Sequence, residues 1–235
     1  MRKRIALIAV TVVLSVLTIM PVAAQQVGPQ DIIGETRVHL DGERAHVRTS
    51  ETNLGNLVAD AVRYYAEEVG GSEVDVAFVH AGSIRASVDE GSIRVLDLLQ
   101  VYTFNNWIVS MELTGEELLS ALERGVGSYP DASGGFLQVS GVSFSFDPNR
   151  SAGERIVEAL VGGTPVDGNE TYIVATNNFL ARGGDGYDML GSVPVSRMQN
   201  LYAWSFKRVD DALLEYVEAH SPLSLQVEGR IRVEN

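Results

Sequence analysis

Four loops of this sequence carry the residue types that could do chemistry. They span residues 48–56, 80–85, 102–106 and 178–187, and each combines polar or glycine residues with an arginine, phenylalanine or aspartate at the edge of a predicted helix or strand. Binding and catalytic side chains concentrate in loops that a rigid scaffold holds in place. These four loops are therefore the candidate site.

Signatures of a complete enzyme are missing from the sequence. The four histidines (His39, His46, His80 and His220) form no HExxH, HxH or DxH pattern, and no serine sits in a GxSxG turn. Neither a P-loop nor a GxGxxG motif is present, and the glycine-rich segment around Asp185 lacks the alternating acids of a calcium loop. We expect no catalytic residue, metal site or cofactor within this chain.

Hydrophobic periodicity predicts the elements that must position these loops. Apolar residues between Leu54 and Tyr65 recur at three- and four-residue spacing, which predicts a helix from Asn53 to the Gly70-Gly71 stop. Further helices are expected at 96–101, from 114 onward and at 206–219, and strands at 74–79, 107–113, 136–146, 156–161, 172–176 and 225–233, with a strand or hairpin within 31–47. This order predicts an α/β (α+β) fold with a mixed β-sheet and packed helices.

Composition excludes several classes of protein. The 235 residues include 31 acidic and 18 basic side chains and no cysteine, and the formal net charge is −13. Such a surface repels phosphate backbones and anionic lipids, so we expect no nucleic-acid binding. The absence of cysteine rules out disulfides and thiolate metal sites. With 45% hydrophobic residues, the chain is expected to fold as a globular domain.

The N-terminus has the pattern of an export signal. Three basic residues at positions 2–4 precede an apolar run over 5–20 and the small residues that end at Ala24. This pattern predicts a signal peptide over 1–24 and one domain over 25–235, with its motif-bearing core at 31–193. An uncleaved N-terminal anchor is the alternative. Either outcome places the domain in the periplasm or outside the cell, without stable membrane contact if the signal is cleaved.

The four loops, taken in order, resemble a known family. They are similar to successive motifs in the C-terminal domain of the 5′-nucleotidase and UDP-sugar hydrolase family. The matching segments are residues 51–57, Gly82–Arg85, Phe104–Asn106 and the run from Asn178 to Tyr187. In that family the C-terminal domain holds the substrate, and an N-terminal metallophosphoesterase domain hydrolyses it with two metal ions. The resemblance implies the fold of that C-terminal domain and a nucleotide or nucleoside as the ligand.

The resemblance also implies roles for single residues. Phe104 and Phe179 would stack on the two faces of the nucleobase, and Asp185 would accept hydrogen bonds from the ribose hydroxyls. Arg48 and Arg85 would bind the anionic end or the sugar oxygens. The remaining candidates are His80, at a position that faces the base edge, and a supporting set made of Gly82, Asn106, Gly183, Gly184 and Gly186.

Each role has a simpler structural alternative. Phenylalanine is usually a core residue, an arginine in an acidic protein usually forms a surface ion pair, and a loop aspartate often binds nearby backbone N–H groups. Asn53 and Asn56 are expected to cap the helix that follows, and Gly55 to allow close packing.

Three departures from the family pattern bear on function. His80 stands where the family has asparagine, which puts the base preference in question. Thr103 replaces a proline, and the metallophosphoesterase domain is absent from the sequence. The leading hypothesis is a substrate-recognising half that acts with a separately encoded metallophosphoesterase carrying the divalent metal. The alternatives are a nucleotide-binding protein without chemistry and a degenerate structural copy.

Overall fold

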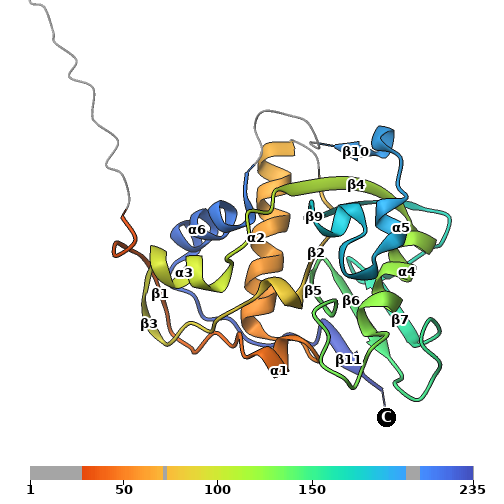
Figure 1. Ribbon diagram of the computed structural model, residues 1–235, viewed down its shortest axis with the longest axis horizontal. Helices are drawn as coiled ribbons and strands as arrows, with labels where there is room; N and C mark the ends of the chain where they lie inside the picture. The colour runs from red at the N-terminus through yellow and green to blue at the C-terminus, as the bar shows by residue number, and fades with distance from the viewer. Residues whose placement is uncertain (1–27, 71–72, 200–206, 235) are drawn as a thin grey trace, which may run out of the picture.

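A five-stranded mixed sheet forms the centre of the molecule (Figure 1). The computed structural model describes residues 28–70, 73–199 and 207–234, so the predicted signal peptide lies outside the described residues. Strands β2 and β9 are parallel and all other neighbours in this sheet are antiparallel, which confirms the expected mixed sheet. In spatial order the strands are β10 (Met198–Gln199), β4 (Ile108–Thr114), β9 (Thr171–Asn177), β2 (Val76–His80) and β5 (Leu137–Ser140).

Two smaller sheets complete the β-structure. The first contains β11 (Ile231–Val233), β6 (Val142–Phe146), β7 (Ile156–Val161) and β8 (Thr164–Pro165), and the second pairs β1 (Ile32–Thr36) with β3 (Gly91–Arg94). One sequence expectation was wrong here, because the last strand starts at Ile231 instead of residue 225. Of the strand or hairpin expected within 31–47, the structure has the strand, β1, which pairs with β3 far along the chain.

The helices pack around the central strands. In Figure 1, α3 and α6 lie to the left of the long helix α2, and α4 and α5 lie on the right of the view. Most of the apolar positions that predicted α2, including Leu54, Leu57 and Val58, are fully buried, and Tyr65 is partly buried. The six helices of the described ranges are α1 (Arg44–Val47), α2 (Asn53–Gly70), α3 (Val95–Val101), α4 (Gly115–Val126), α5 (Asp188–Gly191) and α6 (Val209–His220). Within those ranges, none is long and apolar enough to cross a membrane.

The starts of α4 and α2 show how local signals act. The predicted capping box of α4 is present, because Thr114 Oγ1 accepts from Glu117 N–H and the Glu117 carboxylate accepts from Thr114 N–H. For α2 the predicted caps were wrong. Thr52 Oγ1 accepts from the N–H of Gly55 at 2.9 Å, whereas Asn53 binds the backbone of neighbouring loops and Asn56 donates to Glu51. Asn53, rather than the cap, thus ties the first candidate loop to the backbone of Asp41 and His39.

Candidate functional site

The candidate loops meet around one cavity of about 280 Å³. Strand β2 leads into the 80–85 loop and strand β9 into the 178–187 loop, and these two strands are parallel neighbours, so both loops leave the sheet at the same edge. The lining residues are Arg48, His80, Gly82, Phe104, Asn106, Gly134, Phe179 and Asp185. Seven of these eight were singled out from the sequence, and Gly134 was not.

Phe104 and Phe179 are not core residues. Their exposed fractions are 42% and 40%, and both rings line the cavity. Phe179 packs against His80 with ring centroids 5.0 Å apart, and Phe104 meets Tyr102 edge to face at 6.3 Å. A Cβ at Gly184 would lie 2.5 Å from the Phe179 ring, so only glycine leaves room for that ring where it stands. Both rings therefore keep apolar area available to a ligand.

Asn177, which the sequence reading missed, holds the Phe179 loop. Its side chain is fully buried, and its Oδ1 accepts from the backbone N–H groups of Phe179 and Leu180 at 3.0 Å each. Because the oxygen is occupied in this way, the amide nitrogen points to His80 Nδ1 at 3.3 Å and to the Tyr102 hydroxyl at 3.4 Å. An asparagine directly after a predicted strand and before a glycine-rich loop was the signal available in the sequence.

His80 is a neutral hydrogen-bond donor in this arrangement. Its pKa is lowered to about 4, mainly by burial; the charge of Asp185 opposes this shift and that of Arg48 adds to it. Since Nδ1 accepts from the Asn177 amide, the proton of the neutral ring resides on Nε2. A neutral imidazole has one acceptor and one donor. The acceptor of His80 is bonded to Asn177, which leaves the Nε2–H as the donor of a ring that lines the cavity.

The two candidate arginines differ in position. Arg48 lines the cavity, and its Nε is buried without a hydrogen-bond partner in the described part of the chain. Burial lowers the pKa of Arg48, as do the charges of Arg44 and Arg85, while Asp185 opposes them. Arg85 does not line the cavity. Its guanidinium lies 6.0 Å from the centre of the Phe104 ring and donates to the carbonyl of Gly82 at 3.3 Å.

Neither of these two arginines forms an ion pair within the described part of the chain. The surface ion pair considered as the simpler alternative is therefore absent there. The cavity wall thus carries the Arg48 guanidinium, and no carboxylate of the described residues forms an ion pair with it.

Asp185 sits at the tip of the glycine-rich loop with φ 54° and ψ 27°, in the left-handed region that non-glycine residues rarely adopt. Gly183 and Gly186 on either side have φ of 86° and 78°; they shape the turn without lining the cavity. The backbone carbonyl of Asp185 accepts a hydrogen bond from the Arg124 guanidinium. No hydrogen bond to its carboxylate was found among the described residues, so that group does not serve as a local loop brace there.

Gly134 and the supporting residues close the remaining walls. The N–H of Gly82 donates to the carbonyl of Gly134 at 2.8 Å, which joins two loops that are far apart in sequence. Asn106 donates from its amide to the side-chain oxygen of Asn178 at 3.1 Å and so links the loop of Phe104 to that of Phe179. Within the described ranges, no group of three or more His, Asp or Glu side chains is placed to hold a metal ion.

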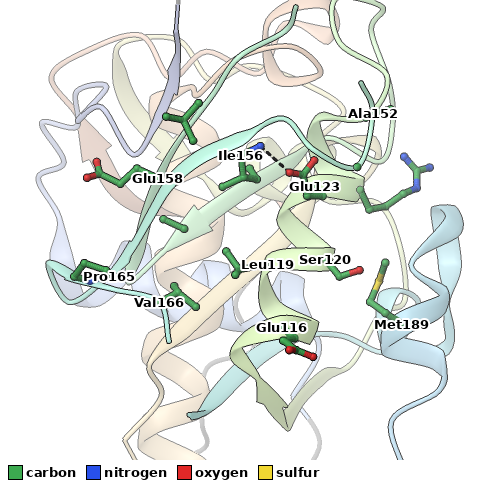
Figure 2. A pocket seen from close by; sticks show the side chains of 15 residues that line it. Glu116, Leu119, Ser120, Glu123, Ala152, Ile156, Glu158, Pro165, Val166 and Met189 are labelled. Atoms are coloured by element: carbon green, nitrogen blue, oxygen red, sulfur yellow. Dashed lines mark hydrogen bonds between the residues drawn. The ribbon is translucent and has the colours of Figure 1, made fainter. Parts of the chain in front are cut away.

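A larger groove of about 990 Å³ lies between α4 and β7 (Figure 2). Leu119 and Ser120 of α4 line it together with Ile156 and Glu158 of β7. The dashed line in Figure 2 marks the hydrogen bond from Ile156 N–H to the Glu123 carboxylate, 2.7 Å long. None of the residues singled out from the sequence lines this groove, so size alone does not identify the functional site.

Fold and site together define a mixed α/β domain whose loops gather two exposed phenylalanines, an arginine and a carboxylate around one cavity. The family model described as the 5′-nucleotidase, C-terminal domain matches residues 32–192, a range that includes all four candidate loops. The chain belongs to this family, as the sequence motifs predicted.

Individual relatives agree with this assignment. The chain is 36% identical over 205 residues to the trifunctional nucleotide phosphoesterase protein YfkN of Bacillus subtilis. This alignment covers 85% of this chain and 14% of that protein. It is 33% identical over 195 residues to the UshA protein of Escherichia coli, covering 83% of this chain and 32% of that protein.

A solved structure gives the same result. The 5′-nucleotidase precursor of Thermus thermophilus superposes with a TM-score of 0.78 at 37% identity, over 88% of this chain and 40% of that one. The chain therefore spans well under half the length of the relatives it matches.

Proposed function

We propose that this chain is the nucleotide- or nucleoside-recognising domain of a 5′-nucleotidase-type hydrolase. The observation that carries the proposal is the pair of exposed phenylalanine rings, Phe104 and Phe179, in a single cavity with Arg48 and Asp185. Flat bases stack on such rings with little dependence on base identity, each contact contributing about 1–3 kcal/mol. Family membership adds independent support, because several relatives are named as nucleotidases or nucleotide phosphoesterases.

The polar residues of the cavity bind the rest of the ligand. The Asp185 carboxylate accepts hydrogen bonds from the ribose hydroxyls, and Arg48, whose Nε has no hydrogen-bond partner among the described residues, donates to the sugar or the anionic end. Arg85 contributes its positive charge from a position 6.0 Å from the centre of the Phe104 ring. His80 reads the base edge with the one donor that its hydrogen bond to Asn177 leaves free.

In this proposal ester hydrolysis is the task of a separately encoded metallophosphoesterase that carries the divalent metal, and both proteins act in the periplasm or outside the cell. The basic and apolar pattern of residues 2–24 supports export. The chain aligns with 14–38% of the length of the curated relatives, so those hydrolases use many residues that have no counterpart in the aligned region.

Calorimetry with AMP, adenosine and UDP-glucose tests recognition. Phe104→Ala and Phe179→Ala are each expected to weaken binding by about 5- to 150-fold, the equivalent of one stacking contact. Tyr64→Ala is the matched control, because Tyr64 is 37% exposed but packs on Tyr216 and His220 away from the cavity. Absence of heat with all three ligands at millimolar concentration would refute the proposal.

Phosphate release from AMP tests whether a separate hydrolase performs the hydrolysis. The purified chain with Mn²⁺ is expected to release none, and the mixture with the partner hydrolase is expected to release it. Binding that persists without turnover in any mixture would instead favour a nucleotide-binding protein without chemistry. Turnover by the purified chain alone would show that the proposed division is wrong.

A further inference from the structure

Arg124, which none of the sequence motifs includes, does not line the cavity but contacts the backbone of Asp185, which does. It belongs to the last turn of α4, and its guanidinium donates to the backbone carbonyl of Asp185. The same guanidinium lies 5.7 Å from the centre of the Tyr187 ring, within the range of a cation–π contact. One side chain therefore contacts both the strained residue at the tip of the glycine-rich loop and the buried aromatic residue that follows.

Glycines on two loops make room for this guanidinium. A Cβ at Gly186 would lie 2.8 Å from Arg124 Nε, and one at Gly135 would lie 3.3 Å from Arg124 Nη2. The Tyr187 hydroxyl donates to the carbonyl of Gly135 at 2.5 Å, so the two loops are also joined to each other. Arg124 thus packs against the 133–136 loop and the 184–187 loop at once.

The position of the Asp185 carboxylate depends on these contacts. Asp185 holds φ 54°, a left-handed conformation that is strained for a non-glycine residue and persists where the surrounding contacts support it. The Arg124 guanidinium is a charged donor, and it gives the Asp185 carbonyl a hydrogen bond. Without that donor, the loop is free to relax toward ordinary backbone angles, which would turn the carboxylate away from its present position beside Gly134.

We propose that Arg124 is a positioning residue that orients the Asp185 carboxylate toward the hydroxyl groups of the ligand. This inference rests on the proposed function, in which Asp185 binds those hydroxyls. A purely structural role at the end of α4 is the competing explanation, since basic residues there also interact favourably with the helix dipole.

The experiment compares adenosine with 2′,3′-dideoxyadenosine by calorimetry on the full chain. The wild type is expected to prefer adenosine by about 10- to 100-fold, the effect of hydrogen bonds to a charged acceptor. In Arg124→Ala the preference is expected to fall below about threefold while the affinity for the dideoxy compound stays unchanged, because base stacking does not involve Asp185. Arg124→Lys keeps the charge and is expected to retain part of the preference.

Arg155→Ala is the matched control. Arg155 also donates to backbone carbonyls at the end of α4, those of Val126, Gly127 and Tyr129, but it lines neither wall of the cavity. Its loss is expected to lower thermal stability and to leave the hydroxyl preference at the wild-type value. If Arg124→Ala does not fold, Arg124→Lys carries the test, with an unchanged preference counting against the proposal.

The outcomes separate this inference from the proposed function. A wild-type preference that survives in Arg124→Ala overturns the positioning role, and so does an equal loss of affinity for both ligands, which indicates a structural role. A wild type that binds neither compound overturns the proposed function itself. A wild type that binds both equally removes the hydroxyl role of Asp185, and the inference falls with it.

Discussion

Acid is expected to destabilise this protein through His80. The residue is 6% exposed and has a pKa of about 4 in the folded chain, whereas the unfolded chain has the ordinary value of about 6.5. Because the unfolded state binds the proton more readily, the contribution of His80 is fully present above pH 6.5 and is lost as the pH falls toward 4. Linkage gives a loss of about 2 kcal/mol between pH 7 and pH 5, approaching about 3 kcal/mol near pH 4.

Urea denaturation of the wild type and of His80→Asn at pH 7, 6 and 5 measures this loss. An asparagine side chain does not titrate and can still accept from Asn177, so its free energy of unfolding is expected to lack the His80 contribution to the pH dependence. Carboxylates titrate in both proteins and cancel in the difference. The gap between the two free energies is expected to change by about 2 kcal/mol from pH 7 to pH 5.

His39→Gln is the matched control, because His39 is exposed and lies outside the cavity. That variant keeps His80 and is expected to follow the wild-type curve. A gap between wild type and His80→Asn that stays constant within about 0.5 kcal/mol over this pH range would refute the reasoning. Nitrogen NMR of the His80 ring checks the same argument independently, since we expect the proton on Nε2 and an unprotonated Nδ1.

Three further predictions concern buried contacts. Gly184→Ala is expected to weaken adenosine binding about tenfold in calorimetry, because its Cβ would lie 2.5 Å from the Phe179 ring and displace it; unchanged affinity would contradict this. Gly55→Ala is expected to lower the free energy of unfolding by about 2–4 kcal/mol in urea, since its Cβ would lie 2.1 Å from Oε1 of the buried Gln138; a loss under about 1 kcal/mol would count against it. Asn177→Ala is expected to cost about 2 kcal/mol by leaving two backbone N–H groups unpaired, measured the same way, and wild-type stability would show that they find other partners.

The helices were predictable where the signal was local. The helix of residues 53–70 follows from apolar residues at helical spacing, and the start of α4 follows from its capping box, because both patterns act within a few residues. The pairing of β1 with β3 was not predictable in this way. It depends on backbone groups that meet only after the chain between them has folded.

The candidate site also has a part that local sequence signals predicted and a part that they did not. The order of the four motifs was enough to single out seven of the eight cavity residues, since each motif carries its own residue types and glycine spacing. The sequence by itself therefore determined the family and the approximate composition of the site.

Only the tertiary structure decided how the site is held. Arg124 and Gly134 come from segments with no motif. Gly134 lines the cavity and Arg124 binds the backbone carbonyl of Asp185, because α4 and the loop before β5 pack beside the glycine-rich loop. The same packing leaves Arg85 beside the Phe104 ring and outside the cavity lining, and it buries His80 beside Asn177, which sets the charge and tautomer of the imidazole. Burial and hydrogen-bond partners are properties of the folded neighbourhood, so residue type and spacing do not specify them.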